Sequence, residues 1–242
     1  MCFDLDSSPP IPVLSGGAVE HEDLVLHSDT DFAAFAALPD ETGDAGVVIL
    51  PDVRGLYRFY EELALRFAER GYPAVAIDYF GRTAGAEKRG EDFDYGPHRE
   101  QTTPEGVMAD TAAAIASLRE RDVRSVFTVG FCFGGRASWL AASWGLGLAG
   151  AVGFYGRPDE LVLERVAQIA CPILALQGGA DQAIPHEANA AFEEALTRAG
   201  ADFELVEYDG APHSFFDRKQ SEFQDASDDA WRRTLEFIER YR

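Results

Sequence analysis

The chain has 242 residues, 46% of them hydrophobic and 26% charged, which are the proportions of an ordinary globular protein long enough to bury a large core. Its 42 acidic residues outnumber the 21 basic ones and give a formal net charge of −21, which disfavours nucleic acid and anionic membrane surfaces as partners. Residues 1–17 lack a basic segment followed by a long apolar one, and no apolar run reaches the length of a membrane-spanning helix, so we expect a cytoplasmic protein.

The elements predicted along the chain alternate between strands and helices. Residues 1–20, which are rich in proline and glycine, are expected to form an irregular extension. Two strands around the turn-forming residues 28–31 predict an antiparallel hairpin at a sheet edge. The predicted strands cover residues 24–27, 32–38, 47–50, 74–77, 126–129, 150–154, 172–176 and 203–208. The predicted helices cover residues 57–70, 108–121, a stretch from 136 onward, and residues 160–168, 187–198 and 228–241.

This alternation predicts a single α/β domain over residues 1–242, with a mainly parallel central sheet and helices on both faces. The polar, glycine-containing segment 81–104 is expected to be a long connection over the top of the sheet. Catalytic groups in such a sheet lie at the carboxyl ends of the strands.

A cysteine stands in the glycine-rich sequence Gly-Phe-Cys-Phe-Gly-Gly at residues 130–135, between a predicted strand and a predicted helix. A nucleophile on a tight strand-to-helix turn needs small neighbours, and Gly130 and Gly134 supply them two residues before and two after Cys132. Serine is the usual residue at this position of the α/β-hydrolase fold. Cys132 is therefore a candidate nucleophile, and the alternative is a buried structural cysteine.

An acid and a histidine follow the cysteine in the order that the α/β-hydrolase triad requires. Asp181 comes after the strand predicted at 172–176, in a glycine-rich turn, and His213 comes after the strand predicted at 203–208. His213 would take and return the proton of Cys132, and Asp181 would orient the imidazole. Either residue alone could be an ordinary loop residue, but all three follow different strands in the required order.

The residues themselves predict neither a metal site nor a phosphate-binding loop. The three cysteines form no CxxC pair, and the sequence contains no HExxH motif or Cys/His cluster. The glycines at 134 and 135 are not followed by the Gly-Lys-Ser/Thr sequence of a phosphate-binding loop.

These motifs resemble those of the dienelactone hydrolase family, from about Val47 to the last helix. The resemblance is carried by residues 130–135, by Gly-Ala-Asp at 179–181 and by Gly-Ala-Pro-His-Ser-Phe at 210–215. It implies hydrolysis of an ester or lactone through an acyl-cysteine intermediate, without a metal or organic cofactor. The family's substrates are carboxymethylenebutenolides, which are opened to maleylacetate.

Two backbone amides are expected to form the oxyanion hole. One belongs to Phe133, directly after the nucleophile, and the other, by position in the loop after the strand at 47–50, to Val53. The family has a glutamate in this loop that helps to generate the thiolate. This chain has the shorter Asp52 there, so the resemblance implies a supporting catalytic role, with an ion pair to Arg54 as the alternative.

The family binds the substrate carboxylate with arginines. Arg82 matches one of them by position and is the candidate for substrate binding, with an ordinary ion pair as the alternative. The second family arginine lies four residues beyond the histidine, where this chain has Asp217.

The sequence therefore predicts a hydrolase that opens a small ester or lactone with Cys132, His213 and Asp181. The departures at Asp52 and Asp217 keep open a general carboxylesterase or thioesterase that acts on another small substrate. A non-catalytic binding protein with a hydrolase fold is a third hypothesis, because fold alone does not determine activity. The oligomeric state is left open.

Overall fold

The computed structural model describes residues 4, 6–14, 19–41, 43–90 and 92–242. Within these residues the strands form one sheet of eight, in the order β1-β2-β4-β3-β5-β6-β7-β8. The ladders from β4 to β8 are parallel, and β1 and β2 add antiparallel at one edge. The strands are β1 (Val19–His27), β2 (Asp31–Pro39), β3 (Ala45–Leu50), β4 (Ala74–Ile77), β5 (Ser125–Phe131), β6 (Gly150–Phe154), β7 (Ile173–Gly178) and β8 (Phe203–Tyr208). The predicted α/β class and the mainly parallel sheet are confirmed.

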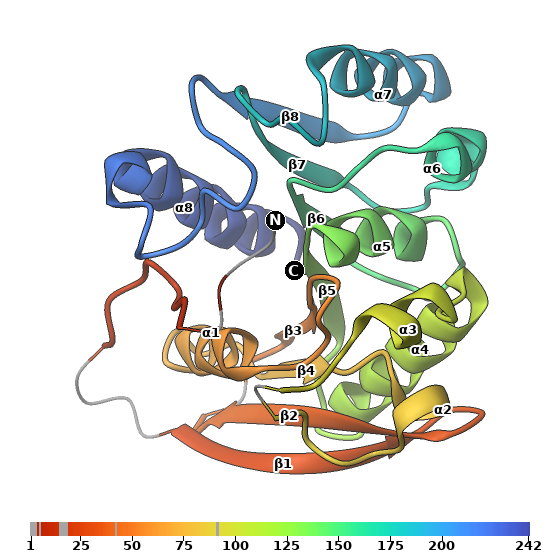
Figure 1. The fold of residues 1–242 in the computed structure, drawn as a ribbon, viewed down its shortest axis with the longest axis vertical. Coiled ribbons are helices and arrows are strands. Elements are labelled where there is room, and N and C mark those ends of the chain that lie inside the picture. The colour runs from red at the N-terminus through yellow and green to blue at the C-terminus, as the bar shows by residue number, and fades with distance from the viewer. Residues whose placement is uncertain (1–3, 5, 15–18, 42, 91) are drawn as a thin grey trace.

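Helices cover both faces of the sheet (Figure 1). α1 and α8 lie on one side, and α4, α5 and α7 lie on the other (Figure 1). The helices are α1 (Arg58–Ala68), α2 (Gly81–Ala84), α3 (Gly96–Glu100), α4 (Pro104–Arg119), α5 (Phe133–Ala142), α6 (Glu160–Arg165), α7 (His186–Ala199) and α8 (Gln224–Tyr241), with 3₁₀ turns at Val166–Gln168 and Ser221–Phe223. None of the helices in the described residues is long and apolar enough to cross a membrane.

The central strands are buried on both faces, which explains their unbroken apolar sequences. Every residue of β3 is buried, and alternate side chains enter two separate hydrophobic cores. Val47 packs in the core beneath α1 and α8, whereas Val48 packs in the core beneath α4 and α5. The sheet is thus fixed from both sides, and the carboxyl ends of its strands are held in place.

The predicted hairpin is present, but its first strand begins earlier than expected, at Val19. Residues 20–23 of this strand are exposed, because β1 is an edge strand that pairs only with β2. Its polar sequence therefore lacks the apolar alternation that would have marked it as a strand.

The N-terminal extension packs against the domain where it is described. Ser8 O accepts a hydrogen bond from Arg218 N at 3.0 Å, and Ile11 is buried in the core beneath α1 and α8. Residues 1–3, 5 and 15–18 of the predicted extension lie outside the described part of the chain.

The connection expected at 81–104 contains the short helices α2 and α3, and α4 begins at Pro104 rather than at 108. The earlier start of α4 has a local cause, because Thr103 Oγ1 accepts a hydrogen bond from Gly106 N at 3.1 Å and Pro104 is favourable in the first helical turn. The middle of the connection is anchored by Arg89, whose Nη2 lies 2.8 Å from Oδ2 of the buried Asp78 at the end of β4.

Candidate active site

Cys132 occupies the turn between β5 and α5, where its backbone has φ 54° and ψ −109°. A non-glycine residue in this region is strained, and such strain persists where the surroundings fix the backbone. Here Cys132 N donates to Phe154 O at 3.0 Å, which ties the turn to the neighbouring strand β6. A Cβ atom on Gly130 or Gly134 would overlap the carbonyl oxygen of Gly134 or Leu50, respectively. Gly130 and Gly134 are therefore required, as predicted, because other backbone atoms lie where a side chain would begin.

Asp181 and His213 meet across the loops that follow β7 and β8. Nδ1 of His213 lies 2.6 Å from Oδ2 of Asp181. The other oxygen of the carboxylate accepts backbone N–H groups from Ala183 at 2.7 Å and Ile184 at 3.1 Å. The side chain of Asp181 is only 1% exposed, so this carboxylate is fixed and faces the imidazole. The pair is built as expected for an acid that orients a histidine.

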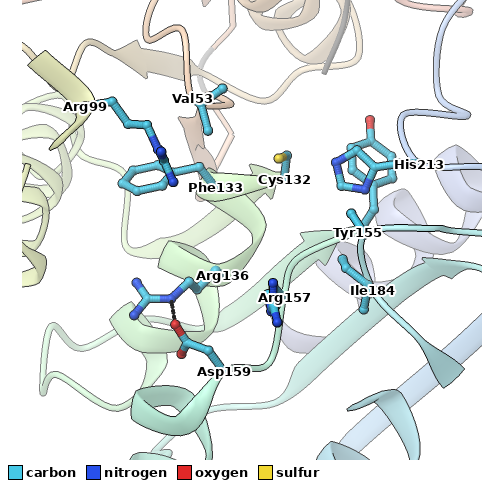
Figure 2. A pocket seen from close by; sticks show the side chains of 11 residues that line it. Val53, Arg99, Cys132, Phe133, Arg136, Tyr155, Arg157, Asp159, Ile184 and His213 are labelled. Atoms are coloured by element: carbon cyan, nitrogen blue, oxygen red, sulfur yellow. Dashed lines mark hydrogen bonds and ion pairs between the residues drawn. The ribbon is translucent and has the colours of Figure 1, made fainter. Parts of the chain in front are cut away.

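Cys132 and His213 line the same cavity, which has a volume of about 480 Å³. In Figure 2 His213 lies on one side of Cys132, and Val53 and Phe133 lie on the other. The ring of Tyr155 packs on His213 with centroids 5.0 Å apart. The cavity is lined by Val53, Arg99, Cys132, Phe133, Arg136, Tyr155, Arg157, Asp159, Ala183, Ile184 and His213.

The two residues predicted to donate amides to an oxyanion hole, Phe133 and Val53, both reach this cavity. Phe133 is the first residue of α5, and the first amides of a helix have no acceptor within the helix. Val53 lies between Asp52 and Arg54, which are joined by a hydrogen bond: Asp52 Oδ1 accepts the backbone N–H of Arg54 at 2.9 Å.

The Asp52 carboxylate is fully buried and forms an ion pair with Arg54, whose Nη2 lies 3.0 Å from Asp52 Oδ2. The hydroxyl of Tyr60 also accepts the backbone N–H of Asp52 at 2.9 Å. The ion pair that the sequence left open for Asp52 is therefore present. A role of Asp52 toward the thiol stays a prediction.

Arg82 is not among the residues that line the cavity in the described part of the chain. Its Nη1 lies 2.7 Å from Oδ2 of the buried Asp110 on α4, and its Nη2 contacts Asp29 in the turn between β1 and β2. Both carboxylates occupy the guanidinium donors, so the structure provides the ion pair that the sequence left open for Arg82. Because Arg82 does not line the cavity, its position does not support the predicted role in substrate binding.

Three other arginines line the cavity: Arg99 on α3, Arg136 on α5 and Arg157 after β6. None of the three is among the site residues predicted from the sequence. Arg157 had a usable signal, because it follows the carboxyl end of a predicted strand by three residues. Arg136 lies one helical turn after Cys132, where helix geometry places side chains on the same face. No sequence pattern marks Arg99 as a cavity residue, because it lies in a segment expected to be a loop.

The arrangement combines a thiol, an imidazole, a fixed carboxylate and two candidate amide donors around one cavity. These are the parts of nucleophilic acyl transfer. Among the described residues there is no group of three or more histidine, cysteine, aspartate or glutamate side chains that could hold a metal ion.

Comparison with known proteins identifies the relatives of this chain. Residues 32–242 match the model of the dienelactone hydrolase family. A carboxymethylenebutenolidase of Rhodococcus opacus is 30% identical over 257 aligned positions, which cover 100% of this chain and 97% of the relative.

Solved structures share the fold. A dienelactone hydrolase-like promiscuous phosphotriesterase from metagenomic libraries superposes with a TM-score of 0.78 and 22% identity, over 93% of this chain and 99% of that one. An acylaminoacyl peptidase of Pyrococcus horikoshii superposes with a TM-score of 0.72 and 14% identity, over 92% of this chain but only 42% of that one. The likeness confirms the predicted α/β-hydrolase fold.

Proposed function

Because the chain belongs to the dienelactone hydrolase family, we propose that it opens a small ester or lactone with Cys132 as nucleophile, His213 as general base and acid, and Asp181 as the group that orients His213. The observation that carries this proposal is the shared cavity of Cys132 and His213, together with the 2.6 Å contact between His213 Nδ1 and Asp181 Oδ2. A contact at Nδ1 leaves Nε2 of the imidazole to exchange a proton with the thiol.

In the first half of the reaction, His213 takes the proton of the Cys132 thiol and the sulfur attacks the substrate carbonyl. The new S–C bond gives a tetrahedral intermediate, whose oxyanion accepts hydrogen bonds from the amides of Phe133 and Val53. The C–O bond to the leaving group then breaks, and the proton on His213 passes to the departing oxygen. The product is a thioester on Cys132 and an alcohol, which for a lactone stays attached to the acyl chain.

In the second half, a water molecule replaces the leaving group. His213 accepts a proton from this water, whose oxygen attacks the thioester carbonyl. The second tetrahedral intermediate uses the same two amides and collapses by breaking the S–C bond. The carboxylic acid leaves, and the sulfur recovers a proton from His213.

Asp52 is proposed to support catalysis from the loop that follows β3. Its carboxylate accepts the backbone N–H and the guanidinium of Arg54, and these bonds hold the turn that carries Val53. These contacts favour a role in positioning the second amide of the oxyanion hole. Direct help in forming the thiolate, which the family resemblance implied, remains the alternative.

The proposed substrate class is a carboxymethylenebutenolide or a related small lactone, as in the printed name of the Rhodococcus opacus relative. A general carboxylesterase or thioesterase is the second candidate, and the position of Arg82 favours it, because that arginine is bonded to Asp29 and Asp110 instead of lining the cavity. A non-catalytic binding protein is the third, and the assembled thiol, imidazole and carboxylate argue against it.

We also propose that residues 1–242 act as one catalytic domain in the cytoplasm. All the candidate catalytic residues lie on or after strands of one sheet, and the thiols of Cys132 and Cys171 suit a reducing compartment.

The deciding experiment compares wild type, Cys132→Ala and Cys171→Ala on dienelactone and on neutral aryl esters. Cys132→Ala is expected to abolish turnover while keeping the circular dichroism spectrum and melting temperature of wild type. Cys171→Ala is the matched control, because Cys171 does not line the cavity, and its activity should match wild type. Intact mass spectrometry of wild type mixed with substrate should show one acyl adduct that Cys132→Ala lacks. Full activity of Cys132→Ala would overturn the proposal.

A further inference from the structure

The turn that carries Val53 is held at both of its ends. Before Val53, the hydroxyl of Tyr79 donates to Pro51 O at 2.8 Å. After Val53, the backbone N–H of Leu56 donates to Oδ1 of Asp78 at 3.1 Å. The backbone N–H of Val53 itself has no hydrogen-bond acceptor among the described residues, and Val53 lines the cavity. The contacts at the two ends of the turn therefore hold the backbone on either side of this amide.

Asp78 is fully buried directly after β4, and both of its carboxylate oxygens accept hydrogen bonds. Besides the bond from Leu56 N to Oδ1, Oδ2 accepts the backbone N–H of Phe80 at 3.0 Å. Oδ2 also accepts Nε of Arg89 at 3.2 Å and its Nη2 at 2.8 Å. The backbone N–H of Asp78 donates to Ala33 O of β2 at 2.8 Å. The group that holds the far end of the turn is therefore itself tied to the sheet.

The Asp78 carboxylate packs directly on the backbone of the turn. Gly55 lies two residues after Val53 and has a φ of 77°. A Cβ atom on Gly55 would lie only 2.3 Å from Oδ1 of Asp78. Contact this close means that a shift of the carboxylate would be passed to the turn.

Arg89 holds Asp78 from the other side. The side chain of Arg89 is 7% exposed, and its Nη1 also donates to Ala84 O at 3.1 Å. Its guanidinium carbon lies 5.0 Å from the ring centroid of Phe93. A buried carboxylate that loses its cation is strongly unfavourable, so Arg89 stabilises the arrangement in which Asp78 bonds Leu56.

We propose that Asp78 is a positioning residue for acyl transfer, which places the amide of Val53 for the oxyanion through its bond to Leu56 and is held in position by Arg89. This inference rests on the proposed function, because the amide matters to the reaction only where an oxyanion forms. Asp78 does not line the cavity in the described part of the chain, so it acts through the turn and not on the substrate. Removal of an oxyanion-hole donor lowers a rate by about 10²- to 10³-fold, and we expect a displaced donor to cost about 10- to 100-fold.

The test compares two second-order rate constants of one thiol. The first is kcat/KM for 4-nitrophenyl acetate, whose attack by Cys132 forms an oxyanion. The second is the rate constant for alkylation of Cys132 by iodoacetamide, which displaces iodide from a saturated carbon and forms no oxyanion. Both reactions need the thiolate, so their ratio is independent of the fraction of thiol that is ionised. Asp78→Asn is expected to lower the ratio of the first to the second about 10- to 100-fold, with the pH midpoint of alkylation unchanged.

Peptide mapping of the alkylated samples also detects unfolded enzyme. Cys171 is half-buried, and burial raises the pKa of its thiol to about 12, so its labelling reports unfolding. Only samples without label on Cys171 enter the ratio. A fall in the ratio then reflects the folded enzyme.

Trifluoroacetone gives a second readout of the oxyanion hole. The sulfur of Cys132 adds to its carbonyl carbon, the thiol proton passes to His213, and the carbonyl oxygen becomes an oxyanion. Because this adduct resembles the transition state, Asp78→Asn should weaken inhibition by about the factor by which it lowers the ratio.

Variants of Arg89 test the same contact while leaving Asp78 in place. Arg89→Gln should lower the ratio, and Arg89→Lys should recover part of the loss, because lysine supplies the charge but not the second donor. Glu69→Gln is the matched control. It removes a carboxylate that is 7% exposed and pairs with Arg66 at 2.7 Å, and Glu69 does not line the cavity. The control should lose stability and keep the wild-type ratio.

The outcomes distinguish this inference from the function on which it rests. Absence of hydrolysis by wild type, with no acyl adduct on Cys132, would overturn the proposed function. Hydrolysis by wild type with a ratio that Asp78→Asn leaves unchanged would overturn the positioning role alone, and so would an equal fall in Glu69→Gln. Should Asp78→Asn fail to fold, an unchanged ratio in Arg89→Gln would overturn the role and a lowered one would support it.

Discussion

Nδ1 of His213 lies 2.6 Å from Oδ2 of Asp181, although the two residues are 32 positions apart in the chain. Asp181 is held in this position by the backbone amides of Ala183 and Ile184, which bond its other oxygen. In the mechanism that we propose, the carboxylate therefore fixes the orientation of the imidazole and stabilises its protonated form during the reaction.

Replacement of Asp181 by asparagine is expected to lower kcat by about 10³- to 10⁴-fold, because an amide at this place favours the wrong tautomer of His213. The size and shape of the side chain are kept, so the melting temperature should change little. Steady-state kinetics on an aryl ester measures the effect, and Asp209→Asn in the exposed neighbouring turn is the control. A loss smaller than 10-fold would mean that Asp181 does not orient the catalytic base.

Cys171 should be unreactive in the folded protein. Burial raises the pKa of its thiol to about 12, so about one molecule in ten thousand carries the thiolate at pH 8. Native protein treated with iodoacetamide at pH 8 is expected to be modified at Cys132 and not at Cys171, as judged by peptide mapping. Labelling of Cys171 should appear after unfolding in urea, and its rapid labelling in the native state would contradict the prediction.

The same thiol makes stability depend on pH in the alkaline range. An unfolded thiol titrates near its ordinary value of 9.0, whereas folded Cys171 titrates near 12, so the folded state binds more protons between these values. The contribution of Cys171 to the free energy of unfolding is complete below pH 9 and is lost as the pH rises toward 12. Urea unfolding at about pH 8 and pH 10.5 should show a steeper loss for wild type than for Cys171→Ala.

Replacement of Asp52 by asparagine tests how this residue supports the site. We expect kcat to fall about 10- to 100-fold, because the turn that carries Val53 loses its ion pair with Arg54 and the second amide is less well placed. The acidic limb of the pH profile of kcat/KM should stay where it is in wild type. A shift of that limb would instead show that Asp52 acts on ionisation of the thiol, and an unchanged kcat would remove it from catalysis.

Replacement of Arg82 by glutamine should cost stability rather than specificity. Asp110 has a fully buried side chain, and losing its partner should lower the free energy of unfolding by about 2–3 kcal/mol at pH 7, a value reduced from that of a fully buried pair because Arg82 is 27% exposed. Burial already raises the pKa of Asp110 despite Arg82, so this carboxyl is more stable in the protonated form when Arg82 is absent.

The free energy of unfolding that Arg82→Gln loses relative to wild type should therefore shrink as the pH is lowered from 7 toward 4. In the variant, protonation of Asp110 removes its buried unpaired charge at low pH, and this stabilisation is lost as the pH rises. Urea unfolding at several pH values measures this change. The ratio of the rates on dienelactone and on a neutral aryl ester should equal that of wild type. A large fall in that ratio would restore Arg82 as a substrate-binding residue.

Much of the fold could be predicted from the sequence because local patterns mark buried parallel strands. The strands at 74–77, 150–154 and 203–208 were predicted with the bounds that the structure shows. The first strand was predicted too short because its exposed residues lack an apolar pattern. α3 was missed because a helix of five residues in a polar segment is too short to show a period.

The sequence by itself determined the order of Cys132, Asp181 and His213 and the strand that precedes each of them. A parallel sheet brings the carboxyl ends of its strands to one edge, so chain order and strand ends were enough to predict that these residues would meet. Only the tertiary structure decided which arginines face the cavity. Arg82 bonds to Asp29 and Asp110, whereas Arg99, Arg136 and Arg157 converge from separate elements. The contacts of a long, flexible side chain depend on which groups the fold brings within its reach, and no local sequence pattern predicts them.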